Sequence, residues 1–484
     1  MRVDLEFGDH TMSADSENQP TSRHPWETYD DVLNRDTRSV PDQLREGPVP
    51  DIGTEPLRAD RYYDPDFFAK EVEHVWKKTW QFACREEEIP NSGDVLVYDV
   101  VGKSLLITRQ SDGSIRAFHN SCLHRGRKLA TERGCMKEFY CPYHGFVWNT
   151  DGTFAHNPMG WDFPHWQDKD NSLPEAKTAT WGGFVFINLD NNAPPLEDIL
   201  YPLNEHFARY DFENRYIAVH AKILVDANWK TTCEAFMESH HSLATHPQIL
   251  PYLADVNSQY DLPSAHVSRH FSAQMVSSPL TNREYSEAEI VEAMLGAGWS
   301  SSGAGVGGEV AVPEGFTARA FMADYSRKTF TEEDGHDYSD KPDAEMLDAL
   351  LYNLFPNMSF WAGYMPNLTY RWRPYGLAPE KSIMDVYLLK CVPKDGPRPE
   401  PAPVLEIGFG EPVVNTGLGG LETIFEQDLA NIPHVQAGIR ASATGVSHLG
   451  KYSEMRIRQM HRMIDQYIAE GEGGTAKGAR TAGR

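Results

Sequence analysis

Two short segments in the first half of the chain combine cysteine with histidine at the spacing of metal ligands. Cys122 and His124 form a Cys-x-His pair, and Cys141 and His144 form a Cys-x-x-His pair further along. Each pair is expected in a short loop between extended stretches, so the two loop tips can face one metal centre. Two thiolates and two imidazoles satisfy either a tetrahedral zinc ion or a [2Fe–2S] cluster with two Cys on one iron and two His on the other. The spacing alone leaves both possibilities open.

A second group of possible metal ligands lies later in the chain. Glu234, Glu238 and His241 fall at positions i, i+4 and i+7, so they share one face if this segment is a continuous helix. His246 directly precedes a proline, which disfavours helical backbone there and allows the chain to turn back towards a shared metal. Two His and one carboxylate leave open positions on Fe(II) for O₂ and substrate. Two histidines alone are more often structural, so this motif needs support from the rest of the chain.

The first group of ligands lies in a recognisable sequence context. Cys-x-His-Arg-Gly at 122–126, followed by Cys-x-Tyr-His-Gly at 141–145, closely resembles the Rieske signature of ring-hydroxylating oxygenases. These oxygenases usually carry Trp where this chain has Phe146, which is a departure at a packing position. The resemblance implies a [2Fe–2S] cluster, which relays electrons but performs no substrate chemistry by itself. The residues that the resemblance assigns to the cluster are Cys122, His124, Cys141 and His144.

The second group resembles the mononuclear-iron motif of the same family. The resemblance assigns iron ligation to His241 and His246. A late acidic motif, Glu426-Gln-Asp428, also resembles the family and assigns the third ligand to Asp428, with Glu426 as the alternative. The resemblance further implies that Glu238 bridges a cluster-ligating His of one subunit to an iron-ligating His of its neighbour. Most members carry Asp at that position, so the longer Glu requires an adjusted geometry.

Two further departures lie beside the iron motif. The family most often has Asn at Ala235 and Tyr at His240. We expect Ala235, Phe236, Met237 and His240 to line the substrate pocket, with metal ligation by His240 as an alternative. These apolar or neutral side chains favour an uncharged, aromatic or polycyclic substrate.

The resemblance also implies the architecture. We expect an α+β fold in which an all-β Rieske domain is inserted in a helix-grip catalytic domain, an antiparallel sheet covered by helices. Strand-like segments between turns from about 84 to 190, and a mixed α/β pattern after Pro194-Pro195, agree with this division. The expected parts are a partly flexible N-terminal arm at 1–60, a helix of the catalytic domain at 61–84, the Rieske domain at 85–190, the catalytic domain at 191–472 and a flexible tail at 473–484.

Hydrophobic periodicity predicts the elements that position the two sites. We expect helices at about 65–82, 229–241, 419–440 and 453–470, and strands at about 217–225, 368–374 and 383–391. The segment GAGVGG at 303–308 formally matches G-x-G-x-x-G, but serines precede it and a proline soon follows. A dinucleotide site needs a strand before this motif and a helix after it, so we expect a surface loop instead.

Composition excludes several other classes of protein. The net charge of −25 comes from 45 basic and 70 acidic residues and offers no basic stripe for nucleic acid. No run approaches the ~20 consecutive apolar residues of a membrane span, and the first residues do not resemble a secretory signal. Six cysteines, three of them between 122 and 141 beside histidines, indicate metal binding rather than disulfides. We therefore expect a cytoplasmic protein without a membrane or nucleic-acid partner.

The resemblance implies a terminal oxygenase with one [2Fe–2S] cluster and one Fe(II) per chain. It implies O₂ as a substrate and two electrons relayed from NAD(P)H through a ferredoxin and/or a flavin reductase. The implied assembly is a head-to-tail homotrimer, with or without a small β subunit. We expect cis-dihydroxylation or mono-oxygenation in aromatic compound catabolism. A mono-oxygenase or demethylase acting on an N- or O-methyl or quaternary amine substrate is one alternative, and a Rieske electron carrier with a binding domain is another.

Overall fold

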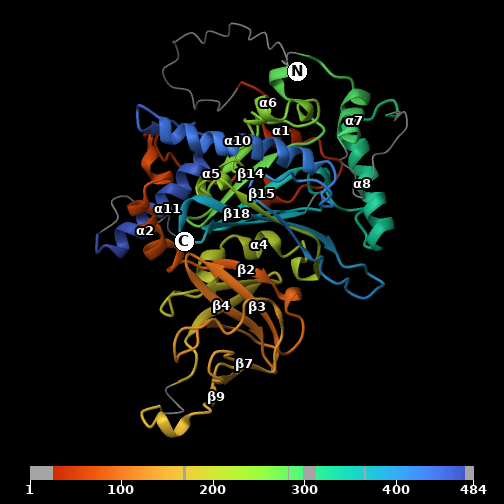
Figure 1. The fold of residues 1–484 in the computed structure, drawn as a ribbon. Helices are drawn as coiled ribbons and strands as arrows, with labels where there is room; N and C mark the ends of the chain where they lie inside the picture. Colours follow the sequence, from red (N-terminus) through yellow and green to blue (C-terminus); the bar gives the residue numbers. More distant parts are fainter. Residues whose placement is uncertain (1–24, 167–170, 282, 298–311, 365–366, 475–484) are drawn as a thin grey trace.

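The computed structural model describes residues 25–166, 171–281, 283–297, 312–364 and 367–474. An all-β domain projects from one end of a larger domain that combines a sheet with helices (Figure 1). The α+β architecture predicted from the sequence is therefore confirmed. Within the described residues, no helix is both long enough and apolar enough to cross a membrane.

The all-β domain contains two sheets in its described part. The larger has seven strands in the order β2-β11-β10-β5-β4-β3-β6, and the smaller has the order β7-β8-β9. A tight turn with positive φ at Val101 and Gly102 joins β3 to β4, as in hairpins whose twist matches their strands. The strands are β2 (Gln81–Arg85), β3 (Asp94–Val100), β4 (Lys103–Arg109), β5 (Ile115–His119), β6 (Gly134–Cys135), β7 (Glu138–Tyr140), β8 (Val147–Asn149), β9 (Phe154–His156), β10 (Glu175–Trp181) and β11 (Phe184–Asn188).

The larger domain is built on a sheet with the strand order β13-β14-β15-β16-β17-β18-β12-β19. Neighbouring strands are antiparallel except for β12 and β19, which are parallel. Its strands are β12 (Arg215–Val225), β13 (Gln259–Asp261), β14 (Val267–Ser272), β15 (Ala349–Leu354), β16 (Met358–Trp361), β17 (Leu368–Tyr375), β18 (Ala378–Cys391) and β19 (Val404–Ile407). A separate short pair joins β1 (Leu57–Arg58) to β20 (Val446–Ser447).

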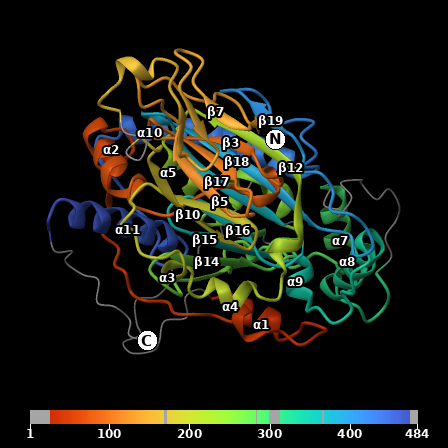
Figure 2. The same cartoon turned by 90° about the horizontal axis from the view of Figure 1, so that it is seen from below.

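Helices cover the face of this sheet that lies away from the all-β domain. Figure 1 shows α5 (Trp229–Glu234), α10 (Leu421–Ala441) and α11 (Met455–Gly471) on that side. Seen from below, α7 and α8 stand at one flank of the molecule (Figure 2). The other helices are α1 (Tyr29–Leu33), α2 (Pro65–Glu71), α3 (Glu197–Leu200), α4 (Leu203–Phe207), α6 (Ser242–Thr245), α7 (Glu287–Gly296), α8 (Ala318–Asp334) and α9 (Asp343–Leu347).

The structure corrects two of the predicted helices. The helix expected at 65–82 is α2 followed by a π-helical turn that ends at Trp76, and residues 81–85 form strand β2. The helix expected at 229–241 ends at Glu234, so Glu238 and His241 lie in the irregular segment that follows it rather than on its face. The predicted strands and the two late helices match β12, β17, β18, α10 and α11 within a few residues. The GAGVGG segment lies outside the described residues.

The described part of the N-terminal arm packs against the larger domain. Tyr29, Val32 and Leu33 of α1 are buried in a hydrophobic cluster shared with β14 and β15. The Tyr29 hydroxyl donates a hydrogen bond of 2.8 Å to Asp348. From residue 25 onward the arm therefore wraps around the catalytic domain and is not a loose tail.

Candidate metal centres and substrate cavity

Two turns of matching shape present the Cys and His pairs of the all-β domain. In each turn the backbone N–H of the cysteine donates a hydrogen bond of 2.8 Å to the carbonyl of the residue five positions later. The pairs are Cys122 with Arg127 and Cys141 with Phe146. Gly126 and Gly145 donate back to the carbonyls of these cysteines at 2.8 and 2.9 Å. Both glycines have positive φ, of 76° and 78°, which other residues adopt only with strain. The local sequence Cys-x-x-x-Gly thus explains the shared geometry of the two loops.

The four side chains of these loops fit a [2Fe–2S] cluster. Cys122 and Cys141 are buried and form no disulfide. The rings of His124 and His144 lie with centroids 4.6 Å apart. The Nδ1 atoms of both rings are buried without a hydrogen-bond partner among the described residues, a costly state unless another group binds them. Burial raises the pKa of the Cys122 thiol, and the backbone N–H of His124 opposes that shift.

An aromatic shell surrounds one side of this site. Phe146 stacks on His124 with centroids 4.8 Å apart and an interplanar angle of 19°. Phe163 and Trp166 pack edge-on against Phe146. This packing agrees with the expectation that residue 146 has a packing role. Cys135, which lies outside both pairs, is exposed in β6 and forms no disulfide.

The second site brings together three side chains from distant parts of the chain. Ligand atoms of His241, His246 and Asp428 all lie within 4.8 Å of one another. Asp428 Oδ1 lies 2.9 Å from His246 Nε2 and 3.6 Å from His241 Nε2. The backbone of His246 has φ −125° and ψ 52°, so the chain leaves helical conformation before the proline, as predicted. The donor set suits a divalent iron with open positions.

The other ring nitrogen of each histidine is held by a side chain. His241 Nδ1 lies 2.6 Å from Glu238 Oε1, and His246 Nδ1 lies 2.8 Å from Gln427 Oε1. Such partners fix the orientation of metal-binding imidazoles and leave Nε2 for the metal. Our reading of the sequence missed Gln427, although its position next to Asp428 on α10 was a usable signal.

The structure distinguishes the two acidic candidates on α10. Asp428 is 4% exposed and faces both histidines. Glu426 instead accepts a hydrogen bond from the backbone N–H of Val413. Gln436 lies eight residues after Asp428 on α10. Its side chain accepts hydrogen bonds of 3.0 Å from the Asn228 N–H and the Thr231 hydroxyl. These bonds fix α10 against α5 and thereby fix the position of Asp428.

Charges of opposite sign surround the iron-site histidine His241. Burial alone would lower the pKa of His241, but the carboxylates of Glu238 and Asp428 outweigh it and raise the pKa to about 9. Burial would raise the pKa of Glu238, yet the charge of His241 and hydrogen bonds from His240 and His241 hold it far below its usual range. The site is therefore strongly favourable for a cation.

A cavity of about 130 Å³ opens beside the three ligands. Of the four residues expected in the substrate pocket, Ala235 and Phe236 line this cavity, whereas Met237 and His240 do not. Met237 faces a separate small cavity near α11, and the His240 side chain is 42% exposed and lies 2.9 Å from Glu238. The lining residues are Ala235, Phe236, Glu238, Ser239, His241, Ser242, His246, Ile249, Tyr252, Leu253, His270, Ser272, Gln274, Ala349, Leu351, Trp361, Tyr370, Leu421, Ile424, Phe425 and Asp428.

Curated relatives of this chain act on quaternary amines. It is 33% identical over 217 residues to the glycine betaine monooxygenase oxygenase subunit of Pseudomonas aeruginosa, covering 44% of this chain and 49% of the relative. It is 31% identical over 189 residues to the carnitine monooxygenase oxygenase subunit of Escherichia coli, covering 38% and 50%. The chain thus spans about half the length of the curated relatives it matches.

Solved structures with the same fold include a carnitine-oxidising quaternary ammonium Rieske monooxygenase and a naphthalene 1,2-dioxygenase variant bound to phenanthrene. The first has a TM-score of 0.61 at 17% identity and covers 88% of this chain and 99% of its own. The second has a TM-score of 0.60 at 19% identity and covers 87% and 94%. At these identities the likeness concerns the fold alone.

Two family models match the two domains. The model for the Rieske [2Fe-2S] domain matches residues 79–165, and the model for the ring hydroxylating alpha subunit (catalytic domain) matches residues 206–470. The second match spans more than half of the chain and contains His241, His246 and Asp428. The first contains both Cys and His pairs. The chain therefore belongs to the Rieske non-haem iron oxygenases, as an oxygenase alpha subunit with a [2Fe–2S] domain and a non-haem iron catalytic domain.

Proposed function

We propose that this protein is a terminal oxygenase that mono-oxygenates a substrate carrying a methylated ammonium group. The observation that carries the proposal is the wall of the cavity beside His241, His246 and Asp428. Aromatic rings of Phe236, Trp361, Tyr370 and Phe425 line it, and its described lining contains no Lys or Arg. A quaternary ammonium is attracted to aromatic faces, and a Lys or Arg in the wall would repel it. The quaternary-amine activities of the curated relatives support the same substrate class.

The proposed ligands divide into two sets. Cys122, His124, Cys141 and His144 would hold the cluster, and His241, His246 and Asp428 would hold the iron. The iron held by these three residues would supply the activation of O₂. Within the chain, Glu238 and Gln427 orient the two imidazoles through their Nδ1 atoms. The apolar walls keep water away from the reacting carbon.

Electrons must reach the iron from outside the catalytic domain. The proposed donors are a ferredoxin and/or a flavin reductase, because the chain carries no nicotinamide or flavin motif that we can identify in its sequence. The proposed assembly is a homotrimer in which Glu238 bridges the iron site to the cluster of a neighbouring subunit. The Glu238 side chain is 9% exposed, and its neighbour His240 is 42% exposed, which places this edge of the site at the molecular surface.

An uncharged aromatic substrate, our first expectation from the sequence, is the second candidate. The same rings that attract a cation also stack on a neutral aromatic ring. The expectation rested on four residues near the iron helix, and only two of them line the cavity. Three of the four aromatic rings named above come from β16, β17 and α10, outside the segment from which the pocket was predicted.

Product analysis with ¹⁸O₂ tests the proposed reaction. The purified protein would be incubated with a surrogate reductase and either trimethylammonium compounds or aromatic hydrocarbons. We expect one ¹⁸O atom in the hydroxylated N-methyl product, which then breaks down to formaldehyde and a demethylated amine, and the second in water. Incorporation of both atoms into an aromatic ring would favour the second candidate. Absence of any oxygenated product, despite reduction of the cluster, would contradict both.

A further inference from the structure

One wall of the cavity carries hydrogen-bonding groups that the proposed chemistry does not use. His270, Ser272 and Gln274 alternate along β14 and its continuation, so their side chains face the same side of the sheet. All three line the cavity and are 5%, 1% and 2% exposed. An extended chain rises about 3.3 Å per residue, so Gln274 lies roughly 13 Å from His270 along this wall.

Two polar atoms on this wall are buried without a hydrogen-bond partner among the described residues, His270 Nδ1 and Gln274 Oε1. The Ser272 hydroxyl is engaged by Ser258 at 2.5 Å and by His270 Nε2 at 2.8 Å. The side-chain amide of Gln274 makes no hydrogen bond to any residue in the described ranges, and its Oε1 atom is fully buried. A buried amide without partners costs free energy comparable to a lost hydrogen bond. Because Gln274 lines a cavity, a ligand in that cavity can supply the missing partner.

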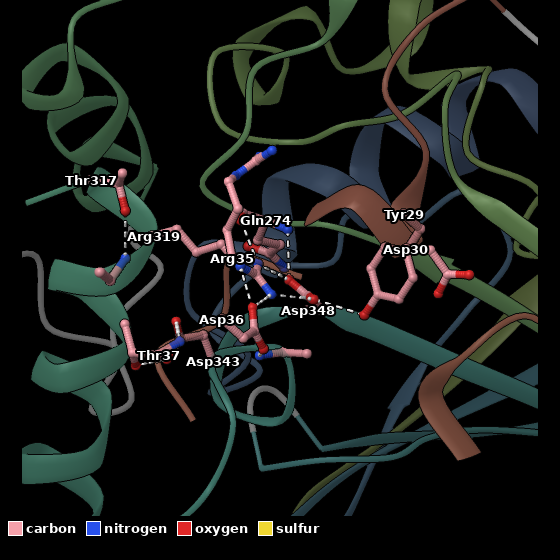
Figure 3. A network of polar contacts seen from close by, with 12 residues as sticks. Tyr29, Asp30, Arg35, Asp36, Thr37, Gln274, Thr317, Arg319, Asp343 and Asp348 are labelled. Atoms are coloured by element: carbon pink, nitrogen blue, oxygen red, sulfur yellow. Dashed lines mark hydrogen bonds and ion pairs between the residues drawn. The ribbon is translucent and has the colours of Figure 1, made fainter. Parts of the chain in front are cut away.

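The backbone of Gln274 is held on both sides by one ion pair. Its N–H donates to Asp348 Oδ1 at 2.8 Å, and its carbonyl accepts from Arg319 Nη1 at 3.0 Å. Arg319 in turn binds Asp348 at 2.6 Å and Asp36 of the N-terminal arm at 2.9 Å (Figure 3). The Tyr29 hydroxyl donates to the other oxygen of Asp348. The position of the Gln274 side chain is thus set through its backbone, which leaves the amide free to bind a ligand.

We propose that the side-chain amide of Gln274 binds a hydroxyl group of the substrate in this cavity. The inference rests on the proposed function and names a second feature of the substrate. A hydroxyl can donate to the amide oxygen and accept from the amide nitrogen, so it satisfies both halves of the group. A carboxylate can only accept and would leave the amide oxygen unpaired. It would also lack a cationic partner, because no Lys or Arg is found in the described lining.

Binding of matched ligand pairs tests this assignment without turnover. Choline and propyltrimethylammonium differ only in a hydroxyl replaced by a methyl group, and so do 2-phenylethanol and propylbenzene. Isothermal titration calorimetry with the intact protein should show that the hydroxyl member of a pair binds at least about tenfold more tightly. Gln274→Met keeps the volume of the side chain and should abolish this preference. The control Gln466→Leu removes a glutamine on α11 that bonds Glu470 outside the cavity and should retain it.

The outcomes separate this inference from the proposed function. A preference confined to the aromatic pair would support hydroxyl binding by Gln274 while contradicting the ammonium substrate. Equal binding of both members of each pair by the native protein would overturn the inference, as would a preference that persists in Gln274→Met. An unchanged far-ultraviolet circular dichroism spectrum and thermal midpoint would show that the variant is folded. If it is not, Gln274→Asn, which withdraws the amide by one methylene, should weaken the preference in the same assay.

Discussion

The two candidate ligands on α10 differ in what their carboxylates already bind. Asp428 faces both histidines, whereas Glu426 is used by the backbone N–H of Val413. We expect Asp428→Ala to lose mononuclear iron and all measurable turnover, because the two histidines alone offer too few ligands. Glu426→Ala, on the same helix, should keep both. Iron determination by mass spectrometry and an oxygen-uptake assay measure the two effects. Iron retained in Asp428→Ala but lost in Glu426→Ala would reverse the assignment.

Substitution of Glu238 tests the proposed path of electrons between subunits. Its carboxylate lies 2.6 Å from His241 Nδ1 and 2.9 Å from His240 Nδ1. Glu238→Gln keeps the size of the side chain but removes its charge and one acceptor. We expect both metals to remain bound while electron transfer from the reduced cluster to iron slows by orders of magnitude. Glu238→Asp should retain part of the rate.

Stopped-flow absorption of the reduced cluster after mixing with O₂ and substrate measures this rate in Glu238→Gln. Normal reduction of the cluster by a surrogate reductase is the control for an intact Rieske domain. A surface ion pair contributes at most about 1 kcal/mol and would not slow the transfer. Turnover of Glu238→Gln close to that of the native protein would therefore end the bridging proposal.

At the scale of elements, the segment after α5 shows why the helix at 229–241 was predicted too long. No proline or glycine lies between Glu234 and His246 to stop the helix. Contacts from other elements hold the next residues outside it: the Ser239 N–H donates to Tyr260 at 3.1 Å, and its hydroxyl donates to the Asp255 carbonyl at 2.8 Å. Tertiary contacts of this kind override the local helix propensity. They cannot be predicted from the sequence of the segment alone, because the partner residues lie elsewhere in the chain. The strands and late helices were predicted because their periodicity needs no such partners.

The ion pair behind Gln274 also holds three elements together. Arg319 of α8 binds Asp348 next to β15 and Asp36 of the arm, and all three side chains are at most 6% exposed. Breaking a buried ion pair completely costs about 3–5 kcal/mol, but Asp36 still faces Arg319 when Asp348 is neutralised. We expect Asp348→Asn to lower the free energy of unfolding by roughly 2–3 kcal/mol in urea titrations followed by circular dichroism.

An exposed ion pair provides the matched control for Asp348→Asn. Lys128 and Asp99 lie 3.0 Å apart, with side chains 45% and 59% exposed. Lys128→Met should change the free energy of unfolding by no more than about 1 kcal/mol. An equal effect of the two substitutions would contradict the structural role that we assign to the arm and α8.

A buried carboxyl between α5 and α11 predicts a dependence of stability on pH. Burial raises the pKa of Glu234 from 4.5 to about 7, although a hydrogen bond from Tyr62 opposes the shift. Because the folded-state pKa is the higher one, the stabilisation is fully present below about pH 4.5 and is lost as pH rises through 7.

Glu234→Gln removes this titration because the amide is neutral at every pH. Between pH 5.5 and 8 the native protein should lose stability relative to the variant, by roughly 2 kcal/mol at most. Thermal midpoints of both proteins across this range measure the difference. A constant difference between the two midpoints would show that Glu234 does not titrate there.

On the scale of the whole molecule, the two centres of one chain lie far apart. Strand β7 lies between the two cluster loops in sequence, and helix α6 directly follows His241. Figure 1 shows β7 and α6 at opposite ends of the molecule. The proposed route therefore runs from the cluster of one subunit to the iron of another. The motifs at 122–145 and 234–246 indicated the Cys and His ligands that we propose for each centre, because those ligands are close in sequence, whereas Asp428 was suggested only by the family resemblance. The wall containing His270, Gln274, Trp361 and Tyr370 was not predicted, since its residues meet only through the sheet.

Iron stoichiometry, combined with one substitution in each site, tests the central claim most directly. We predict three iron atoms per chain in the reconstituted native protein. Cys141→Ser should lose two iron atoms and the Rieske electron paramagnetic resonance signal. Asp428→Ala should lose one iron atom and keep that signal. Zinc in place of iron at Cys122 and Cys141, or two iron atoms per chain that Asp428→Ala leaves unchanged, would contradict the assignment of two iron centres.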